Sequence, residues 1–159
     1  FPIIGADHFI GGGSRNRQQL MDCFTRVALA TAARTKFRAY QVIDELNRLA
    51  RARAKPRSIR VDNGPEFAGR LLDQWAYQNK VELDFSRPGK PTDNAYIEAF
   101  NSRLRHECPN ASWFLSMDDA RNRINDWRVD YNDNRPHSLF GNLTPSEFAT
   151  QLKETRKVV

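Results

Sequence analysis

Hydrophobic side chains recur at steps of three and four residues in several segments, and this pattern predicts α-helices. The expected helices cover residues 36–54, 65–79, 93–106 and 117–131. The side chains expected to face inward are, in chain order, Val42, Ile43, Leu46, Leu49, Ala50, Phe67, Leu71, Leu72, Trp75, Tyr96, Ile97, Phe100, Leu104, Ala120, Ile124, Trp127 and Tyr131. Thr144-Pro145-Ser146-Glu147 predicts one more helix start, with threonine as N-cap and glutamate three residues later.

Shorter segments predict strands, mainly in the first half of the chain. Residues 1–35 indicate irregular β-structure that Gly11-Gly12-Gly13-Ser14 interrupts as a flexible break. The expected strands are Ile3–Phe9, Gln19–Cys23, Val27–Ala33, Ser58–Val61 and Val81–Phe85. The order of strands, helix, strand, helix, strand and then helices favours a mixed α/β sheet flanked by helices.

The size and composition fit a single globular domain. The chain has 159 residues, of which 40% are hydrophobic and 28% charged. We expect the domain to cover residues 1–150 and a C-terminal tail to cover 151–159. Cys23 and Cys108 have no metal-ligand spacing, so reduced thiols are expected. The start at Phe1, without an initiator methionine, suggests a fragment.

The charge balance changes this picture by indicating a partner. The net charge is +6 at pH 7, with mild basic clusters at residues 48–60 and 103–106. Excess cationic charge favours a polyanion, because contacts with phosphates release counterions. Nucleic acid is therefore the expected partner. No apolar run approaches the roughly 20 residues of a membrane span, so a membrane is not expected.

Candidate chemistry begins at Asp62, which directly follows the predicted strand Ser58–Val61. Two-metal phosphoryl transfer needs carboxylates from different elements that hold two divalent ions roughly 3.5–4 Å apart. Glu98, with thirty-five residues between it and Asp62, is the best partner. Asn101, Ser102 and Arg105 share its helical face at i+3, i+4 and i+7, which suits a metal beside a phosphate backbone. An ordinary charged surface helix is the alternative.

A third carboxylate is needed from the first part of the chain. Asp7, in the run "IIGADHF", could lie in a first strand beside the end of a neighbouring strand. Asp22, one strand later, is its rival. The spacing alone does not choose between them.

Three segments of the chain resemble a known family. They are Asp62-Asn63-Gly64-Pro65-Glu66-Phe67, "SRPGKPTDNAYIEAFNSRLRHEC" and "WRVDYNDNRPHSLFGNLTPSEF". Together they look like the catalytic core of insertion-sequence transposases, in the retroviral-integrase-like superfamily with an Asp-Asp-Glu metal site. The similarity is strong from about Arg57 to Ala149. It is weaker from residues 22–26, which are similar to the family's "DxFTR" turn, to Lys55.

The resemblance implies an RNase H-like fold, with a five-stranded mixed sheet and helices on both faces. It implies two Mg²⁺ or Mn²⁺ ions held by Asp62, Glu98 and a first-strand aspartate, which Asp7 best matches. It implies Arg105 as the basic residue near the bound DNA end, and we expect further DNA contacts from Arg103, Asn101 and Lys90. Asp22 falls in the turn of the family pattern and receives no metal role.

The resemblance also implies cellular partners. These are the DNA element ends, target DNA, other copies of the chain on DNA, and a separate helix-turn-helix domain for end recognition. The expected location is the bacterial cytoplasm, at the nucleoid. The implied function is DNA end cleavage and strand transfer.

The chain departs from the family pattern at its start, where "GADHFIGGGSRNRQQLMD" is glycine-rich and polar. Two alternatives therefore stand beside the transposase. One is an RNase H-like nuclease without strand transfer, and the other is a decayed remnant that binds DNA without catalysis.

Overall fold

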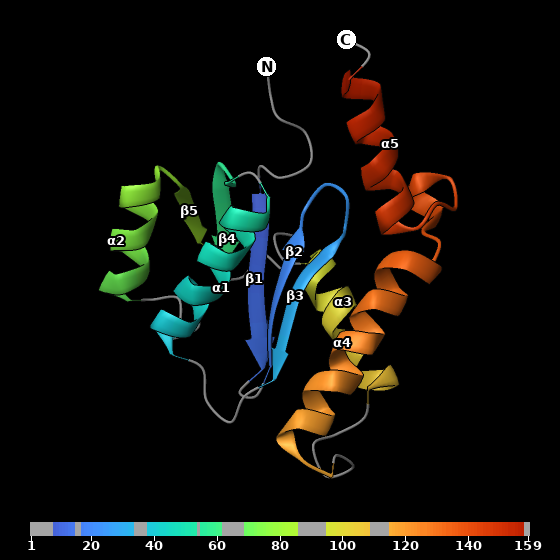
Figure 1. The fold of residues 1–159 in the computed structure, drawn as a ribbon, viewed down its shortest axis with the longest axis horizontal. Helices are drawn as coiled ribbons and strands as arrows, with labels where there is room; N and C mark the ends of the chain where they lie inside the picture. Colours follow the sequence, from blue (N-terminus) through green and yellow to red (C-terminus); the bar gives the residue numbers. More distant parts are fainter. Residues whose placement is uncertain are drawn as a thin grey trace.

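Five strands form one mixed sheet at the centre of the molecule (Figure 1). The computed structural model describes residues 8–14, 17–33, 38–53, 55–61, 69–85, 95–108 and 115–157. The sheet order is β3-β2-β1-β4-β5. The strands are β1 (His8–Ser14), β2 (Arg17–Asp22), β3 (Ala28–Ala33), β4 (Ser58–Val61) and β5 (Glu82–Phe85).

Strand direction divides the sheet into two parts. The pairs β1–β2 and β2–β3 are antiparallel, whereas β1–β4 and β4–β5 are parallel. The parallel connections pass through helices α1 (Ala39–Ala52) and α2 (Arg70–Asn79). The remaining helices are α3 (Ala95–Glu107), α4 (Met117–Asn134), the 3-10 turn η3 (Ser138–Phe140) and α5 (Pro145–Lys157).

Each face of the sheet carries its own hydrophobic core. Consecutive strand residues point to opposite faces, so Leu20 packs with α1 and α2 whereas Met21 packs with α3 and α4. A register shift between Leu20 and Met21 leaves an extra residue in β3. Leu29 and Ala30 therefore both face the first core. Figure 1 shows the sheet between these two helical layers, which confirms the predicted mixed α/β class.

The predicted flexible break at Gly11-Gly12-Gly13-Ser14 is wrong. These residues belong to β1, which is the central strand and pairs with β2 on one side and β4 on the other. Glycine weakens a strand because it loses more backbone freedom and packs no side chain. Here pairing of these residues with β2, and of Gly11 with β4 as well, outweighs that local cost.

Most predicted helical faces match the structure. Of the inward residues expected in the last two helices, Phe100, Leu104, Ala120, Ile124, Trp127 and Tyr131 are buried. Leu71 was predicted to be buried but is 52% exposed, because the inner stripe of α2 consists of Leu72, Trp75 and Ala76. The side chains of Phe67, Tyr96 and Ile97 lie outside the described residues. The helix α5 passes the predicted boundary at residue 150 and ends at Lys157.

Helix α4 is fixed to the edge strand β3 by one amide side chain. The Asn132 Oδ1 accepts a hydrogen bond from the Ala28 N–H at 2.8 Å, and its Nδ2 donates to the Ala28 carbonyl at 3.0 Å. Arg128 Nη1 donates to the same carbonyl at 3.2 Å. An edge strand leaves such backbone groups without a strand partner. The buried side chain of Asn132, on α4 and 104 residues later in the chain, supplies that hydrogen-bond partner.

A chain of rings continues from this contact toward the C-terminus. Successive rings lie 4.1–5.9 Å apart between centroids. The aromatic ladder is Phe100, Trp127, Tyr131, His137, Phe140, Phe148 and Phe24. The predicted capping box then starts α5: Glu147 N–H donates to Thr144 Oγ1 at 3.2 Å, and Thr144 N–H donates to Glu147 Oε2 at 2.8 Å.

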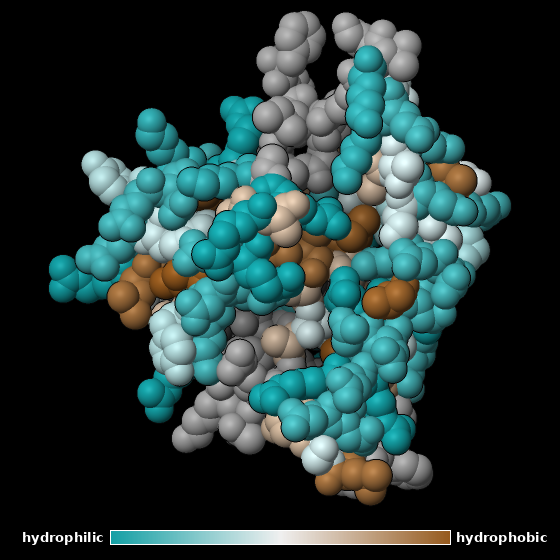
Figure 2. Space-filling model, in the orientation of Figure 1, coloured by the Kyte–Doolittle hydropathy of each residue, from teal (hydrophilic) through white to brown (hydrophobic). Residues whose placement is uncertain are grey.

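The surface gives no sign of a large apolar interface on the face shown in Figure 2. Hydrophilic side chains cover most of it, and hydrophobic ones emerge in small separate places. Exposed hydrophobic residues scattered in this way are ordinary. Within the described ranges, no helix has both the length and the apolar character needed to span a bilayer.

We predict that Asn132→Ala lowers the free energy of unfolding by about 1–3 kcal/mol, because it leaves the buried Ala28 N–H without its acceptor, whereas the Ala28 carbonyl keeps its hydrogen bond from Arg128. Urea denaturation measures this value. Asn122→Ala, at an exposed position of the same helix, is the matched control and should change it by less than about 0.5 kcal/mol. Equal losses in both variants would contradict a special role for Asn132.

Candidate functional site

Glu98 lies in the first turn of α3 and is exposed. Arg105 is exposed on the same helical face, and Asn101 and Ser102 between them are half-buried. The Asn101 Oδ1 is buried without a hydrogen-bond partner among the described residues. The structure therefore confirms that this polar face exists and is accessible at both ends.

The other two predicted metal ligands, Asp7 and Asp62, lie outside the described residues, and so does the predicted DNA contact Lys90. In the part of the chain that is described, no three His, Cys, Asp or Glu side chains form a metal-binding group. The three-carboxylate site thus remains a prediction.

The register between β1 and β4 nevertheless bears on the first ligand. His8, which follows Asp7, pairs with Ser58, whereas Val61, which precedes Asp62, pairs with Gly11. His8 and Val61 therefore lie at opposite ends of the ladder between β1 and β4. The strand β1 itself, HFIGGGS, contains no carboxylate.

Asp22, the rival candidate, closes the turn between β2 and β3. Its Oδ1 accepts hydrogen bonds from the Phe24 N–H at 2.9 Å and the Thr25 N–H at 3.2 Å. Its side chain is fully buried, and this burial raises the pKa of the carboxyl above its ordinary value of 3.8 against the effect of those hydrogen bonds. This arrangement is that of a turn-capping residue.

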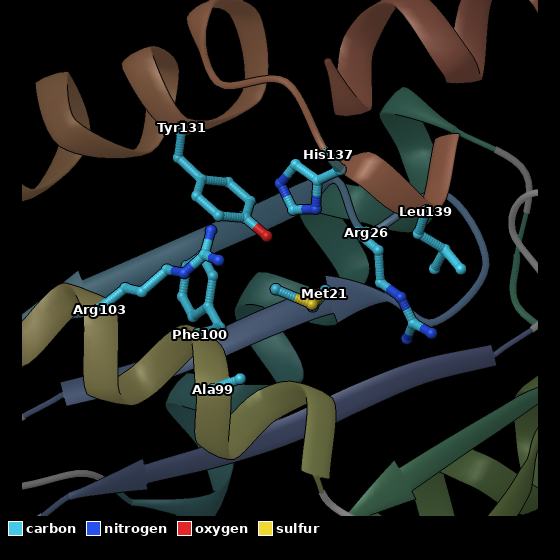
Figure 3. A pocket seen from close by; sticks show the side chains of 8 residues that line it. All are labelled: Met21, Arg26, Ala99, Phe100, Arg103, Tyr131, His137 and Leu139. Carbon is cyan, nitrogen blue, oxygen red and sulfur yellow. The ribbon is translucent and has the colours of Figure 1, made fainter. Parts of the chain in front are cut away.

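Sequence reasoning missed a cavity that opens between α3 and the end of α4. We call it the two-arginine cavity, and its volume is ≈ 150 Å³. Its walls are Met21, Arg26, Ala99, Phe100, Arg103, Tyr131, His137 and Leu139. Figure 3 shows the Tyr131 and His137 rings directed toward each other above Met21. Four separate segments build it, so no local motif could have revealed it.

The cavity has a positive electrostatic character. Burial, followed by the charges of Arg103 and Arg26, lowers the pKa of His137 below its ordinary 6.5. Burial raises the pKa of the Tyr131 hydroxyl to about 12, although Arg103, Arg26 and Arg135 act in the opposite direction. His137 is therefore neutral at pH 7, and its buried Nε2 has no hydrogen-bond partner among the described residues.

The position of Arg26 depends on a strained turn. Its N–H donates to the Asp22 carbonyl at 2.9 Å, and the Asp22 N–H donates to the Val27 carbonyl at 3.0 Å. The φ angle of Arg26 is 60°, in the left-handed region. A non-glycine residue there costs roughly 1–2 kcal/mol, so the turn holds an arginine where glycine or asparagine would fit with less strain.

Comparison with known families identifies the domain. Two models described as "Integrase core domain" match residues 15–91 and 79–145. The chain belongs to the integrase core domain family. It is 46% identical over 136 residues to an insertion element IS407 protein of 31.7 kDa from Burkholderia multivorans. It is 26% identical over 132 residues to the transposase InsF for insertion sequence IS3A from Escherichia coli. The predicted resemblance is thereby confirmed.

This integrase core spans about half the length of those relatives. It covers 49% of the IS407 protein and 46% of InsF, which cover 86% and 81% of this chain. Solved structures agree on the RNase H-like fold. The catalytic core of bovine immunodeficiency virus integrase aligns with a TM-score of 0.70 and 14% identity, over 96% of this chain and 99% of that one.

Two further solved structures extend this agreement. The HTLV-2 integrase catalytic core in complex with magnesium gives a TM-score of 0.68 at 15% identity, over 94% of this chain and 99% of that one. The intasome of simian T-cell lymphotropic virus, in complex with a PP2A regulatory subunit, gives a TM-score of 0.72 at 16% identity, over 93% of this chain and 55% of that one. At these identities the likeness concerns the fold alone.

We predict that Asp22→Asn keeps the turn and Asp22→Ala does not. Alanine leaves two N–H groups without their acceptor and should lower the free energy of unfolding by about 1–3 kcal/mol. Asparagine keeps the Oδ1 acceptor. It also removes a carboxyl group that is costly to ionise because it is buried. Because the folded pKa is raised, ionised Asp22 destabilises the fold as the pH rises above 3.8.

Urea denaturation between pH 4 and pH 7 measures both effects. The stability of Asp22→Asn relative to the native chain should increase with pH. A loss for asparagine as large as that for alanine at pH 7 would contradict this account.

We predict that His137 makes stability fall in mild acid. The folded state holds this imidazole neutral, whereas the unfolded chain protonates it near pH 6.5. Its contribution is therefore fully present above pH 6.5 and is lost as the pH falls toward the lower pKa of the folded state. His137→Phe keeps a ring between Tyr131 and Phe140 and should flatten this part of the profile.

His106→Phe is the control, since His106 is exposed on α3. The measurement is the free energy of unfolding by urea between pH 5.5 and pH 7.5. Identical pH slopes for the native chain and His137→Phe would show that His137 does not carry the effect.

Proposed function

We propose that this integrase core is the catalytic part of an insertion-sequence transposase that cuts DNA ends and joins them to target DNA. Two observations together support this proposal. Integrase core models match residues 15–145, and Glu98 is exposed in the first turn of α3. The fold alone would not suffice, because one fold supports many functions. An accessible carboxylate with an arginine two turns later, on a face separate from the cores, supports phosphoryl transfer in particular.

Asp62, Glu98 and Asp7 are the proposed metal ligands. Their oxygen donors suit Mg²⁺ or Mn²⁺, and the HTLV-2 integrase core was solved in complex with magnesium. When bound, two such ions would activate a water or a DNA 3′-OH as the nucleophile and would stabilise the leaving 3′ oxygen. The role of the protein is to present the carboxylates and to hold the DNA strand in line with them.

The described part of β4 supports the pairing of Asp62 with Glu98. Ile59 and Val61 face the core of α1 and α2. Strand alternation sends Arg60 to the other side, where it forms an ion pair with Asp84 at 2.7 Å. Asp62 comes two positions after Arg60, so the same alternation predicts that its side chain faces α3.

The face of Glu98 also suggests DNA contacts. We propose that Arg105 and Asn101 lie along the DNA strand beside Glu98, and that Lys90 and Arg103, which is on another face of α3, make further phosphate contacts. DNA element ends and target DNA are the proposed substrates. The chain would act as a homo-oligomer together with a helix-turn-helix domain, at the bacterial nucleoid.

One observation favours a second candidate function. The strand β1 contains no carboxylate, and Gly11 pairs with Val61. A chain that lacks a usable first ligand would keep the fold and the positive charge, and it would bind DNA without catalysis. The nuclease alternative uses the same acids and differs only in strand joining.

We predict that Glu98→Gln abolishes metal-dependent strand joining, because an amide cannot replace the charge of a carboxylate ligand. The assay uses a branched DNA that mimics the integration product, with Mn²⁺ or Mg²⁺. Glu154→Gln, at an exposed position of α5, is the matched control and should retain native joining. Asp22→Asn should also retain it, whereas Asp7→Asn should lose it if Asp7 is the first ligand.

Three outcomes separate the candidates. Joining that survives Glu98→Gln would contradict the proposed site. Cutting without joining would favour the nuclease. Metal-independent DNA binding, without either reaction in the native chain, would favour the remnant.

A further inference from the structure

The two-arginine cavity lies on a different face of α3 from Glu98. Arg103 lies five positions after Glu98, and at 100° per residue the two differ by about 140° around the helix. Ala99 and Phe100 line the cavity on the same side as Arg103, whereas Arg105 lies on the Glu98 face. The cavity is therefore a separate feature that the proposed metal chemistry does not use.

The lining of the cavity suits an anion. Two guanidinium groups, a phenol and an imidazole line it, and no carboxylate appears among its described lining residues. Guanidinium groups match phosphate oxygens with paired N–H donors. The volume of ≈ 150 Å³ is about five times the volume of one water molecule in the liquid, so the cavity can hold a group larger than a single water.

The strained turn is an independent observation that favours a ligand. Arg26 adopts a φ of 60° while its side chain lines the cavity. Strained backbone persists where surrounding structure holds it, and it concentrates at ligand sites. An asparagine in this turn would suit the backbone better, but it would not bring a guanidinium to the cavity.

We propose that the two-arginine cavity binds a phosphate group of the DNA backbone, with Arg26 and Arg103 as its cationic ligands and Tyr131 and His137 as polar neighbours. The inference rests on the proposed function for the identity of the polyanion. It adds a contact point from the β2–β3 turn and the segment after α4. It would position a DNA strand at a fixed place relative to the Glu98 face of the same helix.

The test measures binding of a fluorescent DNA duplex by anisotropy across a range of salt, in EDTA so that metal plays no part. Arg26→Asn and Arg103→Gln should each weaken binding roughly tenfold, as loss of a charged hydrogen bond does. Each should also reduce the slope of log affinity against log salt by up to about 0.9, the value for the one phosphate contact that the two arginines share. Arg121→Gln, an exposed arginine of α4 paired with Asp118 at 2.8 Å, removes the same charge elsewhere and should keep the native slope.

Folding is checked separately. Asparagine tolerates the left-handed backbone, so Arg26→Asn should keep the native melting temperature while it loses affinity. Arg103→Lys retains the charge and should bind DNA more tightly than Arg103→Gln. Native salt slopes in both Arg26→Asn and Arg103→Gln would overturn the proposal.

Inorganic phosphate distinguishes the two sources of the anion. At constant ionic strength it should raise the melting temperature of the native chain and not that of Arg26→Asn. If it does so but DNA binding is unchanged in the variants, the cavity is a free-phosphate site and the DNA assignment fails. Because all these readings are taken without metal, a native chain that binds DNA through the cavity but joins no strands would refute only the proposed function.

Discussion

The contact between Asn132 and Ala28 is the constraint on which the C-terminal half of the domain depends. The strand β3 is an edge, and its backbone groups need partners that no further strand provides. One side-chain amide satisfies both the N–H and the carbonyl of Ala28. Because an amide can do this in only one position and orientation, it fixes the register of α4 along the sheet as well as its presence there.

That register determines where the aromatic ladder can form. Trp127 and Tyr131 lie one turn apart on α4 and stack with ring centroids 5.4 Å apart, and Phe100 meets both from α3 at right angles or nearly so. Arg135 then holds the end of the helix through ion pairs with Glu107 and Asp130. The rings lead on to His137, whose segment is also held by a β-bridge to Leu143 and by the 3-10 turn η3. The two-arginine cavity is the space that remains between this segment, α3 and the β2–β3 turn.

The sequence predicted the features whose signals are local. The capping box at Thr144 and Glu147 and the buried stripe of α4 each depend on neighbouring residues, and the structure confirms both. Pairing decided the features that local signals missed. The glycines of β1 indicated a break because their cost is local, whereas strand pairing offsets it: all three pair with the next strand β2, and Gly11 also pairs with the distant strand β4. The roles of Asn132 and of Arg26 depend on contacts across the fold, so periodicity could not indicate them.

The carboxylates at the proposed site divide in the same way. Glu98 could be predicted because a helix places it relative to Arg105, whereas the first ligand depends on the register of β1 against β4. That register is formed by backbone hydrogen bonds, which glycine makes as well as any residue. The ladders of β1 with β2 and β4 therefore set the order of the sheet through the backbone, whichever acidic side chain lies in or beside β1. Conservation of this fold and loss of its chemistry are thus physically independent, and what separates a transposase from a DNA-binding remnant here is a side chain in or beside β1.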